Sequence, residues 1–410
     1  MKEQIETVVI GAGQAGLVMS YYLRQVGQEH VLLERHRVAD RWRRERWDSL
    51  NFQFPNWSLR LPGYAYHARD PEGFANKEDV AAFIDEYAHV IGAPVRCGVE
   101  VRALRRDSES ARYVLDTSHG TIEALHVVLA TGPFQVPSVP AQAASLPREI
   151  TQLHASHYMN PEQLRPGAVL VVGTGSSGCQ IAEELYQAGR TVYLSVSLHK
   201  RAPRRYRGKD LLFWLNVLGR FDTPIDSLPE RKIPPPLLLT GANGGHDVDL
   251  RTFAAHGVVL LGRFRDVRDG AVAFDNDVEQ RLAYADQSLV EFVRCADDYA
   301  ETVGMDSADE VGSELALPLP MKEGGTSTTL DLRAANVNSI VWCTGYKYAF
   351  DWVNVPIFDA AGVPAQRRGV TRCHGVYFLG LHWMHNMRSG VLFGVEDDAA
   401  YLCRQMVPTA

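Results

Sequence analysis

The stretch Thr7-Val8-Val9-Ile10-Gly11-Ala12-Gly13-Gln14-Ala15-Gly16 decides the fold. It predicts an apolar strand, a glycine turn and a helix that continues from Leu17. In such a turn Gly11 permits the tight bend, Gly13 leaves the backbone open to a pyrophosphate, and Gly16 lets the helix pack closely on the strand. The positive N-terminus of the helix then faces the phosphates. The stretch therefore predicts a dinucleotide-binding fold of the Rossmann type.

An acidic strand end follows at the distance that this fold requires. The apolar run Val31-Leu32-Leu33 ends in Glu34, about twenty residues past the glycines, where a carboxylate can accept hydrogen bonds from an adenosine ribose. The same charge would repel a 2′-phosphate, so this first site suits FAD or NAD and argues against NADP. We assign Gln14, Ala15 and Arg35 to the same cofactor site because they adjoin these positions.

Composition narrows the class of protein. The chain has 410 residues, enough for two or three domains, and a hydrophobic content of 46% is ordinary for a globular protein. A net charge of −7 gives no electrostatic footprint for nucleic acid. Six scattered cysteines form no CxxC pair and no Cys/His ligand spacing, so neither a redox disulfide nor a metal site is indicated. The N-terminus leads directly into the first strand, and no apolar run reaches the length of a membrane span, so we expect a cytoplasmic protein.

Mixed polar and aromatic segments follow the first fold. Trp42 and Trp47 lie among charged residues, which fits either a solvated helix face with aromatic anchors or part of the cofactor site. The stretch 51–57, NFQFPNW, combines amides with aromatic rings, as the wall of a ring-binding pocket does. Further along, the apolar run 126–129 ends in Ala130-Thr131-Gly132. If this strand joins the same parallel sheet, its carboxyl end lies beside the first glycine turn, where open α/β sheets bind ligands.

A second complete fingerprint follows a linker rich in proline and alanine at 133–147. The strand 169–172 leads into Gly173-Thr174-Gly175-Ser176-Ser177-Gly178 and a helix. The next strand ends at Ser195 without a carboxylate, and it is followed by Ser197, Lys200 and Arg201. Hydroxyls and cations at this place suit a 2′-phosphate, so we expect NADPH here. The alternative is a solvated basic loop.

An insertion and a C-terminal return complete the predicted organisation. Residues 211–218 predict a short apolar helix, which could pack in the core, wall a substrate tunnel, touch a membrane or lie at the interface of a homodimer. Near the C-terminus, the segment 387–394 is expected to open the last helix, which runs from Val395 to Gln405. Arg388, Ser389 and Leu392 in this segment are expected to face a phosphate or an electron-rich ring edge.

The sequence thus predicts an α/β protein with two Rossmann-like dinucleotide-binding domains. We place a discontinuous FAD domain at 1–155 and 335–410, and an NADPH domain at 160–334 with a mostly helical insertion at 204–249.

This pairing of an FAD fold with an NADPH fold occurs in flavin disulfide reductases and in flavoprotein monooxygenases. The reductases use a CxxC pair beside the flavin, and this chain has none. Nearly end to end, the chain resembles the flavin-containing monooxygenases of the single-component, NADPH-dependent class, especially bacterial members and the plant auxin-forming enzymes. The resemblance is carried by Gly11 to Gly16, Trp47 to Leu50, Ala130 to Gly132, Gly173 to Gly178 and Cys343 to Tyr346.

Departures from the family pattern bear on the active site. The family's catalytic asparagine falls on Gln53, with Asn51 and Asn56 as neighbouring alternatives. In the linker motif His154 and Tyr158 are present, but the expected phenylalanine and glycine are absent. The final tyrosine resembles the N- and S-oxygenating branch more than the Baeyer-Villiger enzymes. For His154, a structural hydrogen bond is the preferred interpretation over direct catalysis.

The resemblance implies a two-stage reaction. NADPH reduces the flavin, O2 adds to form a C4a-hydroperoxide, and NADP+ stays bound to shield this adduct. An amine or sulfide of a small-molecule substrate could take the distal oxygen, whereas a ketone would be attacked by the deprotonated peroxide. The competing hypotheses are an NADPH oxidase or flavin reductase, and a nucleotide-sensing protein with structural FAD.

Overall fold

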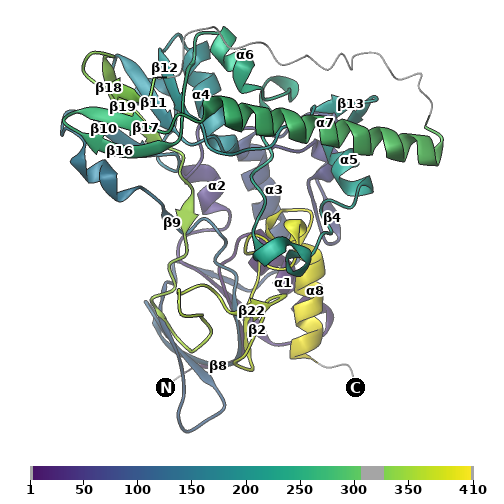
Figure 1. The fold of residues 1–410 in the computed structure, drawn as a ribbon. Coiled ribbons are helices and arrows are strands. Elements are labelled where there is room, and N and C mark those ends of the chain that lie inside the picture. The colour runs from purple at the N-terminus through teal and green to yellow at the C-terminus, as the bar shows by residue number, and fades with distance from the viewer. Residues whose placement is uncertain (1–2, 306–326, 408–410) are drawn as a thin grey trace.

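The computed structural model describes residues 3–305 and 327–407, which form two sheet-based units, one above the other in Figure 1. The chain passes between the units twice. The two crossing segments lie side by side and pair as the antiparallel strands β9 (Val136–Pro137) and β20 (Tyr346–Lys347). Each unit is therefore tied to the other by a double connection.

The first unit is a mixed sheet whose centre is parallel. Strand β1 (Glu3–Ile10) lies between β2 (His30–Glu34) and β8 (Gly120–Leu129), and parallel strand β24 (Val376–Phe378) continues the sheet beyond β8. The Val-Val-Ile run of β1 is buried because both faces of the sheet are covered. The other elements of this unit are α1 (Gln14–Gln25), α2 (Asp40–Arg44), β3 (Arg60–Leu61), β4 (Tyr64–Ala65), α3 (Lys77–Val90), β5 (Val95–Cys97), β6 (Val101–Arg106), β7 (Tyr113–Thr117), β21 (Val353–Asn354), β22 (Gln366–Arg367), β23 (Val370–Thr371) and α8 (Val395–Met406).

The second unit is a parallel sheet in the order β10-β19-β11-β12-β15. Its second fingerprint folds as the sequence predicts, with strand β11 (Ala168–Val172), the glycine turn and helix α4 (Ser176–Gln187) in succession. The two-domain α/β fold is thereby confirmed. The remaining elements are β10 (Thr151–His154), β12 (Val192–Ser195), α6 (Leu250–Ala255), β15 (Val259–Leu261), β16 (Phe264–Arg268), β17 (Ala271–Phe274), α7 (Val278–Val303), β18 (Thr329–Asp331) and β19 (Val337–Trp342).

Strand pairing places the boundaries between the two units a few residues away from the predicted boundaries. The boundaries at 155 and 335 assign β10 and β19 to the first unit, but both strands pair in the second sheet, with Thr151 opposite Ser339 and His154 opposite Trp342. A short buried strand carries no signal that says which of two parallel sheets it joins. The C-terminal segment does return to the first unit, where β24 lies beside β8, so the first domain is discontinuous as expected.

The insertion is helical only in part. It contains the hairpin of β13 (Arg205–Tyr206) and β14 (Lys209–Asp210), helix α5 (Leu211–Val217), single 3-10 turns and irregular loops. Leu211, Leu212 and Trp214 of α5 are buried and belong to the same hydrophobic cluster as the core of the first unit. Of the alternatives for this helix, the structure shows core packing. Across the described ranges, no helix combines the length and apolar character that a membrane span requires.

The insertion and helix α4 meet at an ion pair that gives a prediction about stability. His246 Nε2 lies 2.7 Å from Glu183 Oε1, and this hydrogen bond raises the pKa of His246 above the ordinary histidine value. Because the pKa of His246 is higher in the folded protein than in the unfolded chain, protonation of this imidazole stabilises the fold. The stabilisation is fully present below the unfolded pKa of about 6.5 and is lost as the pH rises through the folded pKa. We expect the free energy of unfolding to lose about 0.5–1 kcal/mol between pH 6 and pH 8, a small value because the imidazole is about one-third exposed.

Urea titrations of the unmodified protein and of His246→Gln at both pH values test this. The variant should show a smaller pH dependence, whereas His89→Gln, a change at an exposed histidine of α3, should behave like the unmodified protein. Identical pH dependence in all three proteins would contradict the assignment.

Candidate cofactor and active site

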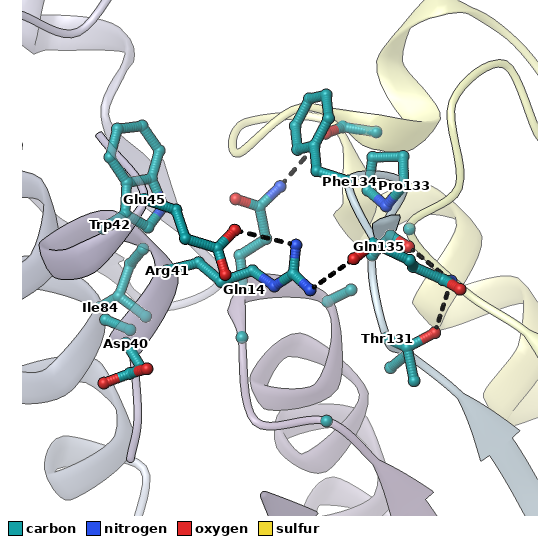
Figure 2. A pocket seen from close by; sticks show the side chains of 18 of the residues that line it. Gln14, Asp40, Arg41, Trp42, Glu45, Ile84, Thr131, Pro133, Phe134 and Gln135 are labelled. Carbon is teal, nitrogen blue, oxygen red and sulfur yellow. Dashed lines mark hydrogen bonds and ion pairs between the residues drawn. The ribbon is translucent and has the colours of Figure 1, made fainter. Parts of the chain in front are cut away.

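A cavity of about 590 Å³ lies at the carboxyl ends of the first sheet and reaches the second unit. Its wall includes the first glycine turn, the ends of β2 and β8, and the segment from Ala39 to Phe54, while Ala155 and Ser177 come from the second unit. Figure 2 shows part of this wall, where Arg41 and Glu45 of the α2 segment lie near Gln14 at the start of α1 and Gln135 of the crossing segment. Both fingerprints therefore contribute to a single cavity.

The first glycine turn has the shape of a diphosphate cradle. A Cβ at Gly16 would lie 1.9 Å from the carbonyl oxygen of Gly11, so no side chain fits there and the helix packs directly on the turn. Gly11 has φ of +104°, and a Cβ there would lie 2.6 Å from the Ala130 oxygen. At Gly13, in contrast, a Cβ would meet no protein atom within 4 Å. The open space at Gly13, at the N-terminus of α1, fits the diphosphate of a dinucleotide.

Glu34 is fixed at the edge of the cavity by main-chain hydrogen bonds. Its Oε2 accepts from the Ala12 amide at 3.1 Å and its Oε1 accepts from the His36 amide at 3.0 Å. The neighbouring Arg35 also lines the cavity. A carboxylate held in this way can still accept from ribose hydroxyls through its remaining lone pairs. The arrangement fits the adenosine half of FAD.

The three amides that the sequence nominates for catalysis do not share one environment. Gln53 and Asn51 both line the cavity. The Asn51 Nδ2 donates to the Gly241 oxygen at 3.2 Å, so it is already engaged by the insertion. Asn56 is buried outside the cavity and donates from Nδ2 to the Asp70 main-chain oxygen at 2.9 Å. Of the three amides, Gln53 and Asn51 are therefore the two that line the cavity.

Aromatic rings line the same wall. Trp42 and Trp47, expected as either a solvated face or part of the site, both line the cavity, and Trp42 makes an edge contact with Phe52 at 6.4 Å between ring centroids. At the end of β8, Ala130, Thr131 and Gly132 also line it, as the strand-end pattern predicts.

Several polar residues of the cavity were not predicted. Gln135 donates from Nε2 to Thr131 Oγ1 at 2.9 Å and accepts at Oε1 from the Ala349 amide at 2.7 Å. The Arg41 guanidinium donates to the main-chain carbonyl oxygen of Gln135 at 3.4 Å and forms an ion pair with Glu45 at 3.2 Å (Figure 2). The composition of 133–147 predicts a linker, which gives these side chains no role. The signal that could have found Gln135 is its position a few residues after β8 ends at Leu129, at the ligand-binding edge of the sheet.

Arg46 is a further unpredicted cation in this wall. Its guanidinium lies 5.6 Å from the ring centroid of Trp42 and 5.5 Å from that of Phe134. Burial lowers the pKa of Arg46, while Tyr346 and Glu45 act in the opposite direction. The charge therefore sits between aromatic rings in the space shared by the two units.

The second glycine turn repeats the geometry of the first. A Cβ at Gly178 would lie 1.9 Å from the Gly173 oxygen, and one at Gly173 would lie 2.6 Å from the Cys343 oxygen, whereas Gly175 has no protein atom within 4 Å of its Cβ position. Helix α4 begins at Ser176, and Ser177 lines the cavity. This turn therefore also fits a diphosphate.

Two of the four residues predicted to bind a 2′-phosphate, Ser195 and Arg201, have side chains that are engaged within the protein. Ser195 is buried, donates to the Gly262 oxygen at 2.9 Å and accepts from the Phe264 amide at 3.1 Å. Arg201 pairs with Asp249 and Asp286, so its charge is neutralised within the protein. The main chain of Ser197 bonds Thr174, and Lys200 has no carboxylate within ion-pair distance among the described residues. Of the two predicted cations, Arg201 is therefore paired within the protein, and the role of Lys200 stays a prediction.

Arg388 does not face the cavity. Its Nε donates to Asp222 Oδ1 at 2.7 Å and its Nη2 donates to Asn216 Oδ1 at 2.7 Å, so it binds the insertion. Ser389 is buried and accepts from the His385 amide at 3.0 Å. The segment forms a separate 3-10 turn, Met387–Gly390, and α8 begins at Val395, where the sequence predicts the start of the last helix. Leu392 lines the cavity as expected.

The linker histidine has a structural role. His154 is buried, and its ring nitrogens bond Ser156 Oγ at 2.9 Å and the Gly345 oxygen at 3.0 Å. Burial lowers the pKa of His154, which favours the neutral ring. Tyr158 donates to Glu184 Oε2 at 2.6 Å. Both side chains tie the linker to the second unit rather than contact the cavity.

Two strand–glycine turn–helix units around one cavity define an oxidoreductase that holds two dinucleotides. The model of the pyridine nucleotide-disulphide oxidoreductase family matches residues 8–217, and the chain belongs to this family. An uncharacterised oxidoreductase, CzcO-like, of Geobacillus kaustophilus is 31% identical over 99% of both chains. A probable indole-3-pyruvate monooxygenase of Arabidopsis thaliana, YUCCA1, is 30% identical over 57% of this chain and 55% of its own.

Solved structures share the whole fold. A flavin-containing monooxygenase from Stenotrophomonas maltophilia has a TM-score of 0.68 at 18% identity over 98% of both chains. The bacillithiol disulfide reductase Bdr of Staphylococcus aureus has a TM-score of 0.60 at 14% identity over 98% of both. These matches confirm the expected class at family level, an oxidoreductase of the pyridine nucleotide-disulphide oxidoreductase family, and the expected fold with two dinucleotide-binding domains.

The glycine geometry predicts different outcomes for neighbouring substitutions. Gly13→Val should leave the fold intact and weaken FAD binding by about 100-fold, because its side chain enters open cavity space that the diphosphate needs, and each 1.4 kcal/mol is tenfold in affinity. Gly16→Ala should prevent folding, since its methyl group overlaps a backbone oxygen. Circular dichroism and titration of the apoprotein with FAD distinguish the two effects. Normal FAD affinity in a folded Gly13→Val variant would refute this cofactor site.

Coenzyme binding gives a second comparison. Lys200→Ala should reduce the preference for NADP+ over NAD+ by about tenfold or more, because one charge-assisted hydrogen bond of about 1.5–3 kcal/mol is lost. Arg201→Ala should instead lower the melting temperature, since it leaves Asp249 and Asp286 without their cation. Equilibrium dialysis with each nucleotide and thermal melts provide the measurements. An unchanged preference in Lys200→Ala would show that other groups bind the 2′-phosphate.

Proposed function

We propose that the protein is an NADPH-dependent FAD monooxygenase that transfers one oxygen atom from O2 to an amine or sulfide of a small organic substrate. The observation that carries this proposal is the location of Gln53. It lies on the wall of the cavity that the first glycine turn and Ser177 also line. The proposed catalytic amide, the flavin site and the coenzyme helix thus share one space.

The lining of the cavity supports oxygen chemistry. Phe52 and Phe54 are buried on either side of Gln53, and Leu392 closes the wall from the C-terminal segment. An apolar wall excludes water from a reactive site. An amide can donate a hydrogen bond there without releasing a proton. The chain therefore offers a non-acidic donor beside apolar side chains.

The cysteines support this proposal over disulfide reduction. None of the six, all of which lie in the described part of the chain, lines the cavity. Burial raises the pKa of Cys343 to about 12, so this thiol is not a thiolate at neutral pH. Thiol–disulfide exchange requires a thiolate. The reductase chemistry of some structural neighbours therefore has no nucleophile at this site.

The cofactors would supply the redox chemistry, with NADPH giving a hydride to FAD and FAD passing electrons to O2. The chain would hold FAD through the α1 N-terminus and Glu34, and NADPH through the α4 N-terminus and Lys200. The balanced reaction consumes substrate, O2, NADPH and a proton, and yields oxygenated substrate, water and NADP+.

Named relatives support oxygenation without fixing the substrate. One structural neighbour is the S-allyl-L-cysteine S-oxygenase of Allium sativum, and one partial sequence relative is a Baeyer-Villiger monooxygenase of Streptomyces coelicolor. We favour an amine or sulfide because the linker motif ends in Tyr158, as in the N- and S-oxygenating branch. Oxygenation of a ketone is the alternative.

Measuring NADPH consumption, hydrogen peroxide and product in parallel tests the function. FAD-loaded protein is supplied with 18O2 and with an amine, a sulfide or a ketone, and products are analysed by mass spectrometry. One 18O atom in an amine or sulfide product supports the proposal, and one in a ketone product supports the alternative. NADPH oxidation that gives only peroxide with every compound would indicate an oxidase.

Gln53 yields the sharpest prediction about the reaction. Gln53→Leu should leave flavin reduction by NADPH nearly unchanged but raise the peroxide formed per NADPH, because a donor worth about 1–3 kcal/mol is lost after reduction. Anaerobic reduction rates and peroxide yields are the two measurements. Gln142→Leu, a change at an exposed glutamine outside the cavity, is the control. Uncoupling by Asn51→Leu alone would transfer the role to Asn51.

A further inference from the structure

A buried arginine from the insertion holds the main chain at Gln53. The Arg204 side chain is only 4% exposed, and its Nη1 donates to the Gln53 carbonyl oxygen at 2.7 Å. The same nitrogen lies 3.5 Å from the Thr240 oxygen, and the guanidinium lies 4.4 Å from the ring centroid of Phe74. This arginine therefore connects the second unit's insertion with the loop that lines the cavity.

Asp210 fixes the orientation of Arg204. Its carboxylate, 2% exposed, lies 2.9 Å from Arg204 Nη2. The other carboxylate oxygen accepts from the Leu212 amide at 2.8 Å and so caps helix α5. The Leu211 amide donates to the Arg204 carbonyl oxygen at 2.8 Å, which closes the hairpin on itself. Both charges are thus held by local structure.

Stability alone does not explain why this position holds a buried ion pair, because apolar residues of similar volume often stabilise a protein equally well. An apolar pair could not bond the Gln53 oxygen. What distinguishes the Arg204–Asp210 pair is therefore the directed hydrogen bond to the cavity loop.

Other residues of the insertion also pack against the loop at 51–57 and its surroundings. A Cβ at Gly241 would lie 2.0 Å from the Phe52 oxygen, and one at Gly245 would lie 2.6 Å from the Phe74 ring. Asn51 Nδ2 donates to the Gly241 oxygen at 3.2 Å. The loop is therefore enclosed by the insertion on several sides, and Arg204 is the charged contact among them.

We propose that Arg204 and Asp210 form a positioning pair, which fixes the Gln53 main chain and thereby places the Gln53 amide at the cavity for oxygen transfer. This inference rests on the proposed function, since it assumes that Gln53 takes part in the reaction. It also connects the domain that holds NADPH to the loop beside the flavin, since the insertion follows strand β12 of that domain.

The test replaces the pair without leaving a lone buried charge. Arg204→Met alone strands the Asp210 carboxylate and can unfold the protein, so the main variant is Arg204→Met with Asp210→Asn, which retains an oxygen to cap α5. The matched control is Arg207→Met with Asp297→Asn. Arg207 and Asp297 form a 2.9 Å ion pair from the same hairpin to α7, outside the cavity wall.

Hydrogen–deuterium exchange of the FAD-loaded proteins reports on position without requiring turnover. Peptides covering 51–57 should exchange about tenfold faster in the Arg204/Asp210 variant, as expected for the loss of a charge-assisted hydrogen bond, with β1 and α4 unchanged. The control should match the unmodified protein. Unchanged exchange at 51–57 overturns the proposal.

Turnover separates positioning from a merely structural role. The Arg204/Asp210 variant should release more peroxide per NADPH while keeping its KM for NADPH, and Arg204→Lys, which retains the cation, should recover part of the coupling. Faster exchange with unchanged coupling overturns the positioning role. If the unmodified protein forms no oxygenated product, the proposed function fails by itself, whereas the exchange result is independent of that outcome.

Discussion

The structure depends on one steric constraint, which occurs twice. At Gly16 and again at Gly178 a Cβ would lie 1.9 Å from the carbonyl oxygen of the first glycine of the same turn. Only hydrogen fits, so each helix begins directly against its strand, and its unpaired amides point out of the sheet edge. Gly13 and Gly175 are open for the opposite reason, because the space beside them is free of protein atoms. In each turn, close packing at the last glycine and open space beside the middle glycine together make a phosphate site.

The double crossing between the units turns two such sites into one cavity. Strands β9 and β20 pair, and the residues just before them, from Thr131 to Gln135, also line the cavity. The Gln135 side chain bonds both the end of β8 and the returning segment at Ala349. The crossing segment before β9 is therefore part of the cavity wall.

Electrostatics in the protein are organised mostly by internal pairing. Arg201, Arg204 and Arg388 come from regions that could be taken for ligand-binding loops, yet each is paired with carboxylates of the protein. Desolvation makes an unpaired buried charge costly, so most such cations are matched internally. Arg35 and Arg46 differ, since both line the cavity and neither belongs to an ion pair among the described residues. Their charges are therefore open to the negative charge of a ligand.

The sequence by itself determined the elements whose cause is local. Glycine spacing after an apolar strand depends on sterics within about ten residues, so the strand, turn and helix of both fingerprints form as predicted, and Glu34 and Ala130 both line the cavity. Tertiary structure decided the partners. Whether Arg201 and Arg388 are free, whether Asn56 faces the cavity and which sheet receives β19 all depend on residues far away in the chain. Arg204 shows the same dependence, because it reaches Gln53 across 151 positions of sequence. The sequence determines which side chains are charged, but long-range packing determines which group neutralises each charge.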